Sequence, residues 1–218
     1  MIRAFGSADI VLLLWAVRWT IALSAIAFAG GAVGGLLVAL ARTSDIKWLR
    51  AIAAVFIRIF QGTPLLMQLF LVFFGMNIFG LPINPWIAAA LALTLHASAF
   101  LGEIWRGCIE AAPSGQREAA TALGLGYFDR MTSVILPQAA RIAVAPTVGF
   151  LVQLIKGTSL ASIIGFTELT RTGQIINNAT FSPFLVFGAV AAFYFLLCWP
   201  LSLIARNMEA RFARATTR

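Results

Sequence analysis

Few residues of this sequence could act as acids, bases or charged binding groups inside the apolar stretches, and they are widely spaced. Its single histidine, His96, lies seven residues before Glu103, and Lys156 stands inside a long apolar stretch. One histidine cannot assemble a His-rich metal site, and no Ser-His-Asp or Cys-His pair with supporting spacing is visible. Neither Lys47 nor Lys156 lies in a GxxxxGK[ST] phosphate-binding loop. The sequence therefore predicts no metal site, no enzyme of the membrane and no ATP chemistry of its own.

The two cysteines, Cys108 and Cys198, are far apart in the chain and form neither a CxxC pair nor a metal-ligand spacing. We expect both to fill space in apolar packing.

Polar side chains recur at helical spacing within three apolar stretches, which places them on shared helix faces. Such stripes are expected to face a common cavity, because ionisable groups in a membrane usually face the bundle interior or water. Lys156 could neutralise a carboxylate there and Glu103 an ammonium, as a zwitterion requires. The residues predicted to line this path are Gln61, Thr63, Gln68, His96, Glu103, Gln153, Lys156, Thr158 and Ser159.

Two alternatives to the cavity reading remain open. Lys156 and Arg106 could extend to the membrane interface, as long basic side chains do. Glu103 could pair with Arg106 three residues on, and His96 could be an ordinary packed histidine.

The elements that must position these side chains are membrane helices. The chain is 61% apolar and only 11% charged, with a mean hydropathy of +0.92, whereas soluble domains are about 45–50% apolar and about 25% charged. This excludes a cytosolic enzyme, a secreted module and a disordered protein. The net charge of +8 is read as an orientation signal and not as a nucleic-acid surface.

A helix needs roughly 20 apolar residues to cross a bilayer. Five stretches qualify, at about 17–41, 51–75, 86–105, 142–164 and 182–205. The chain is therefore predicted to be an all-α membrane protein, with one transmembrane domain over residues 1–218. In the first stretch, Gly30, Gly31, Gly34 and Gly35 form GxxxG patterns, typical of close helix packing or of a crossing that slides during transport.

Basic residues predict the orientation, because they accumulate on the cytoplasmic side. Twelve of the 16 lie on one side, with the C-terminus: Arg42, Lys47, Arg50, Arg58, Arg106, Arg117, Arg130, Arg141, Arg206, Arg211, Arg214 and Arg218. We expect the N-terminus outside and the C-terminus in the cytoplasm of a bacterial inner membrane. The first stretch is too long for a cleaved signal peptide.

The longest cytoplasmic loop, about 107–141, is half apolar yet too charged to span. A helix start at Pro113 and good helix formers over 116–123 predict a short helix, and Gly124 and Gly126 predict a break. Residues 127–134 are expected to form a second short helix that ends ahead of Pro137. Such an elbow would fit a groove on a soluble partner and transmit its motion.

The elbow resembles the EAA loop of bacterial ABC importer permeases, with Val134 where the family most often has Ile. The residues that carry the resemblance, and the coupling to ATPases that it implies, are Glu118, Ala119, Ala120, Gly124, Leu136 and Pro137.

Three flanking segments resemble motifs of the permeases for polar amino acids. They are Phe60-Gln61-Gly62-Thr63-Pro64-Leu65-Leu66-Met67-Gln68-Leu69, Ala99-Phe100-Leu101-Gly102-Glu103-Ile104-Trp105-Arg106-Gly107, and Ile155-Lys156-Gly157-Thr158-Ser159-Leu160 with Ile164-Gly165 and Glu168-Leu169. The likeness covers roughly residues 15–212. It implies the five-helix type I importer fold and a complex of two permease subunits, two cytoplasmic ATPases and an external substrate-binding protein. ATP and Mg would be bound by the ATPase, so no cofactor is expected in this chain.

Three positions depart from the pattern of that family. The chain has Gln61 where the family usually has Arg, Gly157 where it has Asp, and His96 where it commonly has Asn. If these positions line the path, an atypical solute such as an amino-acid derivative or opine is implied. The sequence leaves open the solute and whether the second permease is a copy or a related chain. A stand-alone ion-coupled carrier or channel is the alternative function, and it leaves the elbow unexplained.

Overall fold

The computed structural model describes the backbone of residues 3–216, and the side chains in that range except those of Ser114 and residues 211–216. This part of the chain contains helices and no strand. They are α1 (Ser7–Thr43), α2 (Lys47–Gly62), α3 (Leu65–Ile78), α4 (Pro85–Glu110), α5 (Ser114–Ala122), α6 (Tyr127–Arg130), the π-helical turn η1 (Met131–Ile135), α7 (Leu136–Gly157), the 3-10 turn η2 (Thr158–Ser162), α8 (Leu169–Thr180) and α9 (Pro183–Thr216).

The closest packing in the fold joins α1 to α4 through small residues. A side chain at Gly31 would overlap Ala97, and one at Gly35 would have its Cβ 2.8 Å from the Cβ of Leu101. Gly34 faces Ser98 in the same way. The glycines of the first apolar stretch therefore allow two helix backbones to approach closely.

The second apolar stretch, predicted as one span over about 51–75, is not a single straight helix. It breaks into α2 and α3, whose axes differ by 104°. Pro64 has no N–H and disfavours helical geometry at the residue before it, so Thr63 is extended with φ −117° and ψ 142°. The predicted stretch therefore corresponds to two helices with a bend between them, because hydropathy does not show how a proline is accommodated.

The second short helix of the loop does not end before Pro137 as predicted. Instead, α6, η1, α7 and η2 join into one helix, Tyr127–Ser162. In η1 the N–H of Leu136 reaches the carbonyl oxygen of Met131, five residues earlier. This wider turn lies directly before Pro137, whose ring would clash with the carbonyl oxygen four residues earlier in a regular α-helix.

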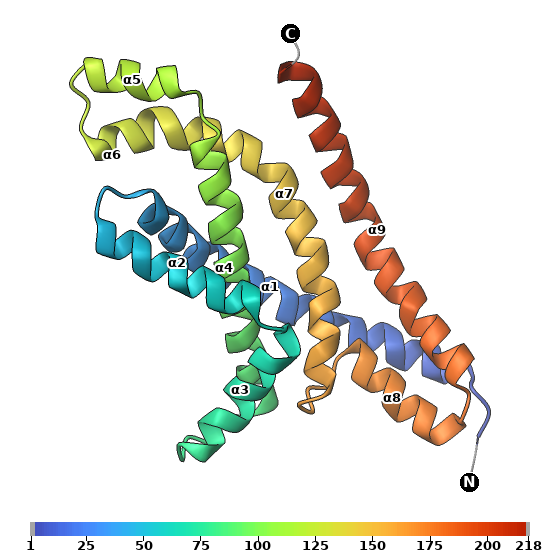
Figure 1. Cartoon of the computed structure of the whole chain (residues 1–218). Helices are drawn as coiled ribbons and strands as arrows, with labels where there is room; N and C mark the ends of the chain where they lie inside the picture. Colours follow the sequence, from blue (N-terminus) through green and yellow to red (C-terminus); the bar gives the residue numbers. More distant parts are fainter. Residues whose placement is uncertain (1–2, 217–218) are drawn as a thin grey trace.

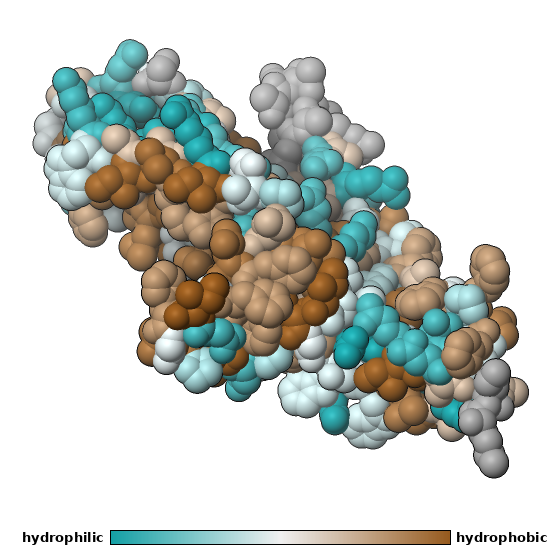
Figure 2. Space-filling view, turned by 60° about the horizontal axis from the view of Figure 1, so that its bottom comes forward, coloured by the Kyte–Doolittle hydropathy of each residue, from teal (hydrophilic) through white to brown (hydrophobic). Residues whose placement is uncertain are grey.

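The helices are arranged so that α5 and α6 project at the end where the C-terminus lies, and the N-terminus lies at the opposite end beside α8 (Figure 1). Four helices are long and apolar enough to cross a membrane, or five if α2 and α3 count as one broken span. Figure 2 shows hydrophobic residues over the middle of one face, with hydrophilic residues at the end that carries α5 and again at the end that carries α8. Exposed Leu37 (65%), Leu71 (68%) and Leu196 (62%) are typical of surfaces that contact lipid or another membrane chain.

Candidate functional site

The break between α2 and α3 is closed by the side chain of Gln68, which is 5% exposed. Its Nε2 donates to the carbonyl oxygen of Phe60 at 2.8 Å, to the carbonyl oxygen of Thr63 at 3.0 Å and to Thr63 Oγ1 at 3.0 Å. Carbonyls freed by a helix break are costly to leave unpaired away from water. Gln68 therefore stabilises the break that Pro64 causes.

The other end of the Gln68 amide contacts His96 on α4. Gln68 Oε1 lies 3.0 Å from His96 Nδ1. The imidazole also packs against Phe100, with ring centres 4.4 Å apart, and lies 6.4 Å from the ring of Phe150 on α7. The structure thus brings together Thr63 of the break, Gln68 of α3 and His96 of α4.

Residues at the end of α7 divide into exposed and buried groups. Gln153 and Lys156 are exposed, whereas Thr158 is fully buried and donates to the carbonyl oxygen of Ile155 at 2.7 Å. Ser159 donates to the carbonyl oxygen of Lys156 at 2.7 Å. Among the predicted path residues, Gln153 and Lys156 are the ones on α7 with side chains free to meet a solute.

Gly157 is the position where the resembling family has Asp. A Cβ at this position would lie 3.0 Å from Leu65 Cδ2, the first residue of α3. The missing side chain lets α3 pack onto the end of α7. Gln61, the other departure beside the break, is exposed near the end of α2.

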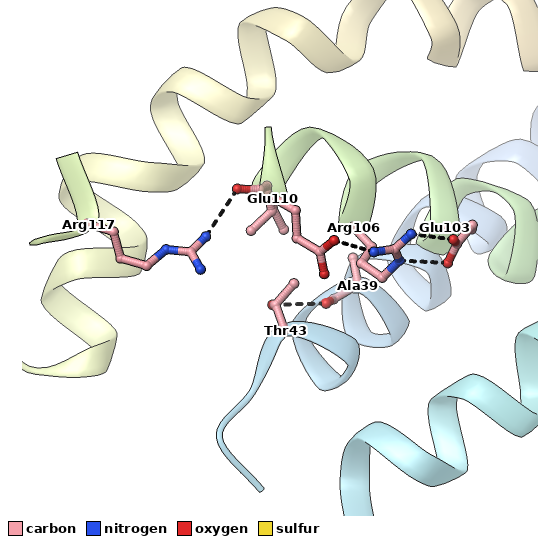
Figure 3. A network of polar contacts seen from close by, with 7 residues as sticks. Ala39, Thr43, Glu103, Arg106, Glu110 and Arg117 are labelled. Atoms are coloured by element: carbon pink, nitrogen blue, oxygen red, sulfur yellow. Dashed lines mark hydrogen bonds and ion pairs between the residues drawn. The ribbon is translucent and has the colours of Figure 1, made fainter. Parts of the chain in front are cut away.

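Glu103 belongs to a different cluster, at the end of α4 (Figure 3). Arg106 Nε donates to Glu103 Oε2 at 2.9 Å, and the same guanidinium pairs with Glu110. Arg117 of α5 reaches the carbonyl oxygen of Ile109 at 3.4 Å. The pairing of Glu103 with Arg106, expected as an alternative, is what the structure shows, and among the described residues Glu103 forms no ion pair with Lys156.

The loop expected to couple to ATPases forms the helix α5 followed by a sharp turn. Gly124 has φ +75°, in the left-handed region that favours glycine, and nothing lies within 4 Å of a Cβ built there. Glu118 and Ala119 are exposed, Ala120 is 3% exposed, and Leu123 and Phe128 expose 79% and 75% of their side chains on the two sides of the turn. Leu136 and Pro137 lie at the start of α7, beyond the π-helical turn.

The sequence of residues 31–216 matches the model of the family described as binding-protein-dependent transport system inner membrane component. The chain belongs to this family. It is a permease of the ABC transport systems, and the predicted resemblance is confirmed.

Two curated relatives of this permease cover nearly its whole length. It is 37% identical to the L-cystine transport system permease protein TcyB of Bacillus subtilis over 199 residues, which is 91% of this chain and 85% of that protein. It is also 37% identical to the glutamine transport system permease protein GlnP of Escherichia coli over 204 residues, 93% of each chain.

Solved structures show the same fold. The crystal structure of an amino acid ABC transporter with histidines superposes on this permease with a TM-score of 0.85. The two chains are 34% identical, and the match covers 92% of this permease and 94% of that chain. The inward-facing methionine ABC transporter MetNI shares the fold at a TM-score of 0.77, with 23% identity over 98% and 100% of the two chains. The permease therefore has the type I importer fold.

One polar cluster of the permease was missed from the sequence. Glu168 is fully buried before α8, where its Oε2 accepts from the hydroxyl of Tyr194 at 2.8 Å and its Oε1 accepts from the N–H of Arg171 at 2.9 Å. Thr20 of α1 lies 3.4 Å away. Burial raises the pKa of the Glu168 carboxyl. In the sequence, Glu168 is visible only as an acidic residue of one motif that resembles the family. Its partners lie on the distant helices α1 and α9, so no spacing pattern connects them to it.

Proposed function

We propose that this permease subunit serves the ATP-driven import of an amino acid or a related zwitterionic solute. The observation that supports it is the left-handed turn at Gly124, which turns the chain from α5 back into α6 at the end of the molecule where the C-terminus lies. The curated relatives named for cystine and glutamine transport favour an amino acid as the solute.

The proposed complex contains a second permease subunit, a copy or a related chain, because one subunit supplies only part of a pathway. Two cytoplasmic ATPases bind ATP and Mg, and an external binding protein delivers the solute. The exposed Leu123 and Phe128, with Glu118 on the same projecting segment, form the contact with the ATPase. This chain hydrolyses no ATP itself.

The proposed orientation in a bacterial inner membrane places the N-terminus outside. It rests on the basic residues counted above and on the separation of the two ends in Figure 1, where α5 and the C-terminus share one side.

The proposed solute path runs past the break between α2 and α3 and the end of α7. Lys156 is exposed there and can neutralise a carboxylate, and Gln61 and Gln153 are exposed polar groups of the same predicted path. Glu103 is left out of this contact because Arg106 and Glu103 form a salt bridge.

The experiment is to purify the chain with its natively associated subunits in mild detergent, reconstitute it in liposomes, and follow ATP hydrolysis. Binding protein loaded with different amino acids is then added to the outside. Stimulation by one loaded form supports the importer and identifies its solute. Absence of any co-purifying ATPase, with solute movement by the chain alone, would instead indicate a carrier.

A further inference from the structure

Gln68 has a fixed hydrogen-bonding polarity, which determines the state of the histidine beside it. Its Nε2, the donor end, is committed to the carbonyl oxygens of Phe60 and Thr63 and to Thr63 Oγ1. An amide that turned over would place its oxygen against those carbonyl oxygens, with no hydrogen between them. Oε1 must therefore be the end that faces His96, and an amide oxygen only accepts hydrogen bonds.

His96 consequently donates from Nδ1 across the 3.0 Å contact. A neutral imidazole carries one N–H, so a proton on Nδ1 leaves Nε2 as a bare acceptor. Among the described residues, Nε2 of His96 makes no hydrogen bond. It is also absent from the fully buried polar atoms that lack a partner, so part of this atom is accessible. It is therefore open to a donor from outside this chain.

The ring is held in this orientation by packing as well. Phe100 lies on α4 one turn away, and Phe150 stacks on Phe100 at 5.6 Å with 15° between the ring planes. Neither aromatic ring offers an acceptor that could compete with Gln68 for the Nδ1 proton.

We propose that Gln68 is a positioning residue that fixes His96 as the Nδ1–H tautomer, so that Nε2 accepts a hydrogen bond from an ammonium or amide N–H of the transported solute. This rests on the proposed function and adds to it the donor that the solute presents. It also explains why His96 can stand where the resembling family has Asn. An Asn side chain could donate to Gln68 with its amide nitrogen and keep its oxygen as the acceptor.

The first experiment measures the tautomer without any solute. The complex is prepared with isotopically labelled histidine, and the spectrum of the His96→Asn complex is subtracted to isolate the signal of the single histidine of this chain. We expect a proton on Nδ1 at neutral pH, and loss of this preference in Gln68→Leu. A proton on Nε2 in the unaltered complex overturns the proposal.

The second experiment measures uptake in four proteoliposome preparations: unaltered, Gln68→Leu, His96→Asn and the double variant. We expect Gln68→Leu to raise KM about tenfold, equivalent to about 1.4 kcal/mol. In the His96→Asn background the same change should raise KM less than about threefold, because an Asn amide has no tautomers and can rotate its oxygen toward the solute without Gln68. An equal cost in both backgrounds assigns Gln68 a structural role only and overturns the proposal.

Failure of the proposed function is distinguishable from failure of this inference. A complex that transports no amino acid contradicts the proposed import, whereas the tautomer is read from the spectrum alone. His96→Leu, which has neither donor nor acceptor, should raise KM at least as much as Gln68→Leu.

Discussion

Glu168 shows at the scale of one residue how a carboxylate is held inside an apolar protein. Its oxygens accept hydrogen bonds from Tyr194 of α9 and from the first turn of α8, and no basic side chain pairs with it among the described residues. Burial disfavours the charged form, so the pKa of this carboxyl is raised. The cluster ties α1, α8 and α9 together at the end opposite α5.

Glu168 makes the stability of the permease depend on pH. Since the folded pKa exceeds the unfolded value of about 4.3, the folded state is favoured while the carboxyl is protonated. That contribution is lost as the pH rises from the unfolded pKa through the folded one. The melting temperature in detergent should fall as the pH is raised from 4 to 8, and this fall should be smaller in Glu168→Gln. Glu209→Gln, exposed on α9, is the control, and an unchanged pH profile in Glu168→Gln would contradict the assignment.

Residues of the candidate site were predictable where a local pattern marks them, and were not where the contact is long-range. Gln68 and His96 were both expected to line a path, yet their mutual hydrogen bond joins α3 to α4, a contact between helices that the spacing within one helix does not reveal. The pairing of Glu103 with Arg106 follows helix spacing and was foreseen as an alternative. The neighbours of Glu168 come from distant segments, so spacing carried no signal for them.

At the scale of elements, the close contact between α1 and α4 depends on glycines, which have no side chain to hold the two backbones apart. At Gly31 an added Cβ would overlap that of Ala97 and lie 3.3 Å from the Ala97 Cα and carbonyl carbon, so the backbones would have to separate. We expect Gly31→Ala to destabilise the permease by about 1–3 kcal/mol, the usual cost of overpacking. Gly188→Ala on α9, where nothing lies within 4 Å, should be neutral or stabilising. Equal melting temperatures for the two variants would refute this account.

The turn after α5 depends on backbone geometry and not on space. Gly124 has φ +75° with open surroundings, so a branched side chain there is opposed by strain of about 1–2 kcal/mol in the backbone alone. We expect Gly124→Val to insert normally but to lose the stimulation of ATP hydrolysis by loaded binding protein. Gly115→Ala, also unobstructed and inside α5, is the matched control. Normal uptake by Gly124→Val would show that the turn is not needed for coupling.

Helices were predictable from hydropathy as segments but not as shapes. The proline at 64 breaks one predicted segment, whereas Pro137, read as a helix end, is accommodated by a π-helical turn and interrupts nothing. The difference lies in the neighbouring turns: Thr63 is extended, whereas the residues before Pro137 widen their hydrogen-bond ring and stay helical. A sequence pattern shows where a proline lies but not which of these responses the surrounding packing favours.

The two ends of the whole molecule lie far apart, with α5 at one and the start of α1 at the other, which makes its orientation testable. Both native cysteines are buried, so they can be replaced by alanine and single cysteines introduced at exposed glycines. Gly6→Cys, ahead of α1, should react with a membrane-impermeant maleimide on intact cells. Gly115→Cys, in α5, should react only after permeabilisation. The reverse pattern would invert the proposed orientation.

Solute recognition belongs to the same scale, because it requires the assembled complex. Lys156→Ala should raise KM for uptake while leaving basal ATP hydrolysis and folding unchanged, since its side chain is exposed and forms no salt bridge among the described residues. Uptake assays in proteoliposomes, with Lys156→Arg as the charge-preserving control, measure the effect. Unaltered uptake by Lys156→Ala, with normal ATP hydrolysis, would remove this residue from the path.

The helix Tyr127–Ser162 is 36 residues long, or about 54 Å of helix axis at 1.5 Å per residue. It begins at the segment proposed to meet the ATPase and ends beyond Lys156, so one hydrogen-bonded element connects the two. The helix is bent between α6 and α7 (Figure 1), where η1 lies, and Pro146 stands inside α7. Bending at either point would absorb part of a rotation applied at the α6 end before that rotation reached Lys156. The stiffness of these two points would therefore limit how much movement at the coupling segment is felt at the solute path.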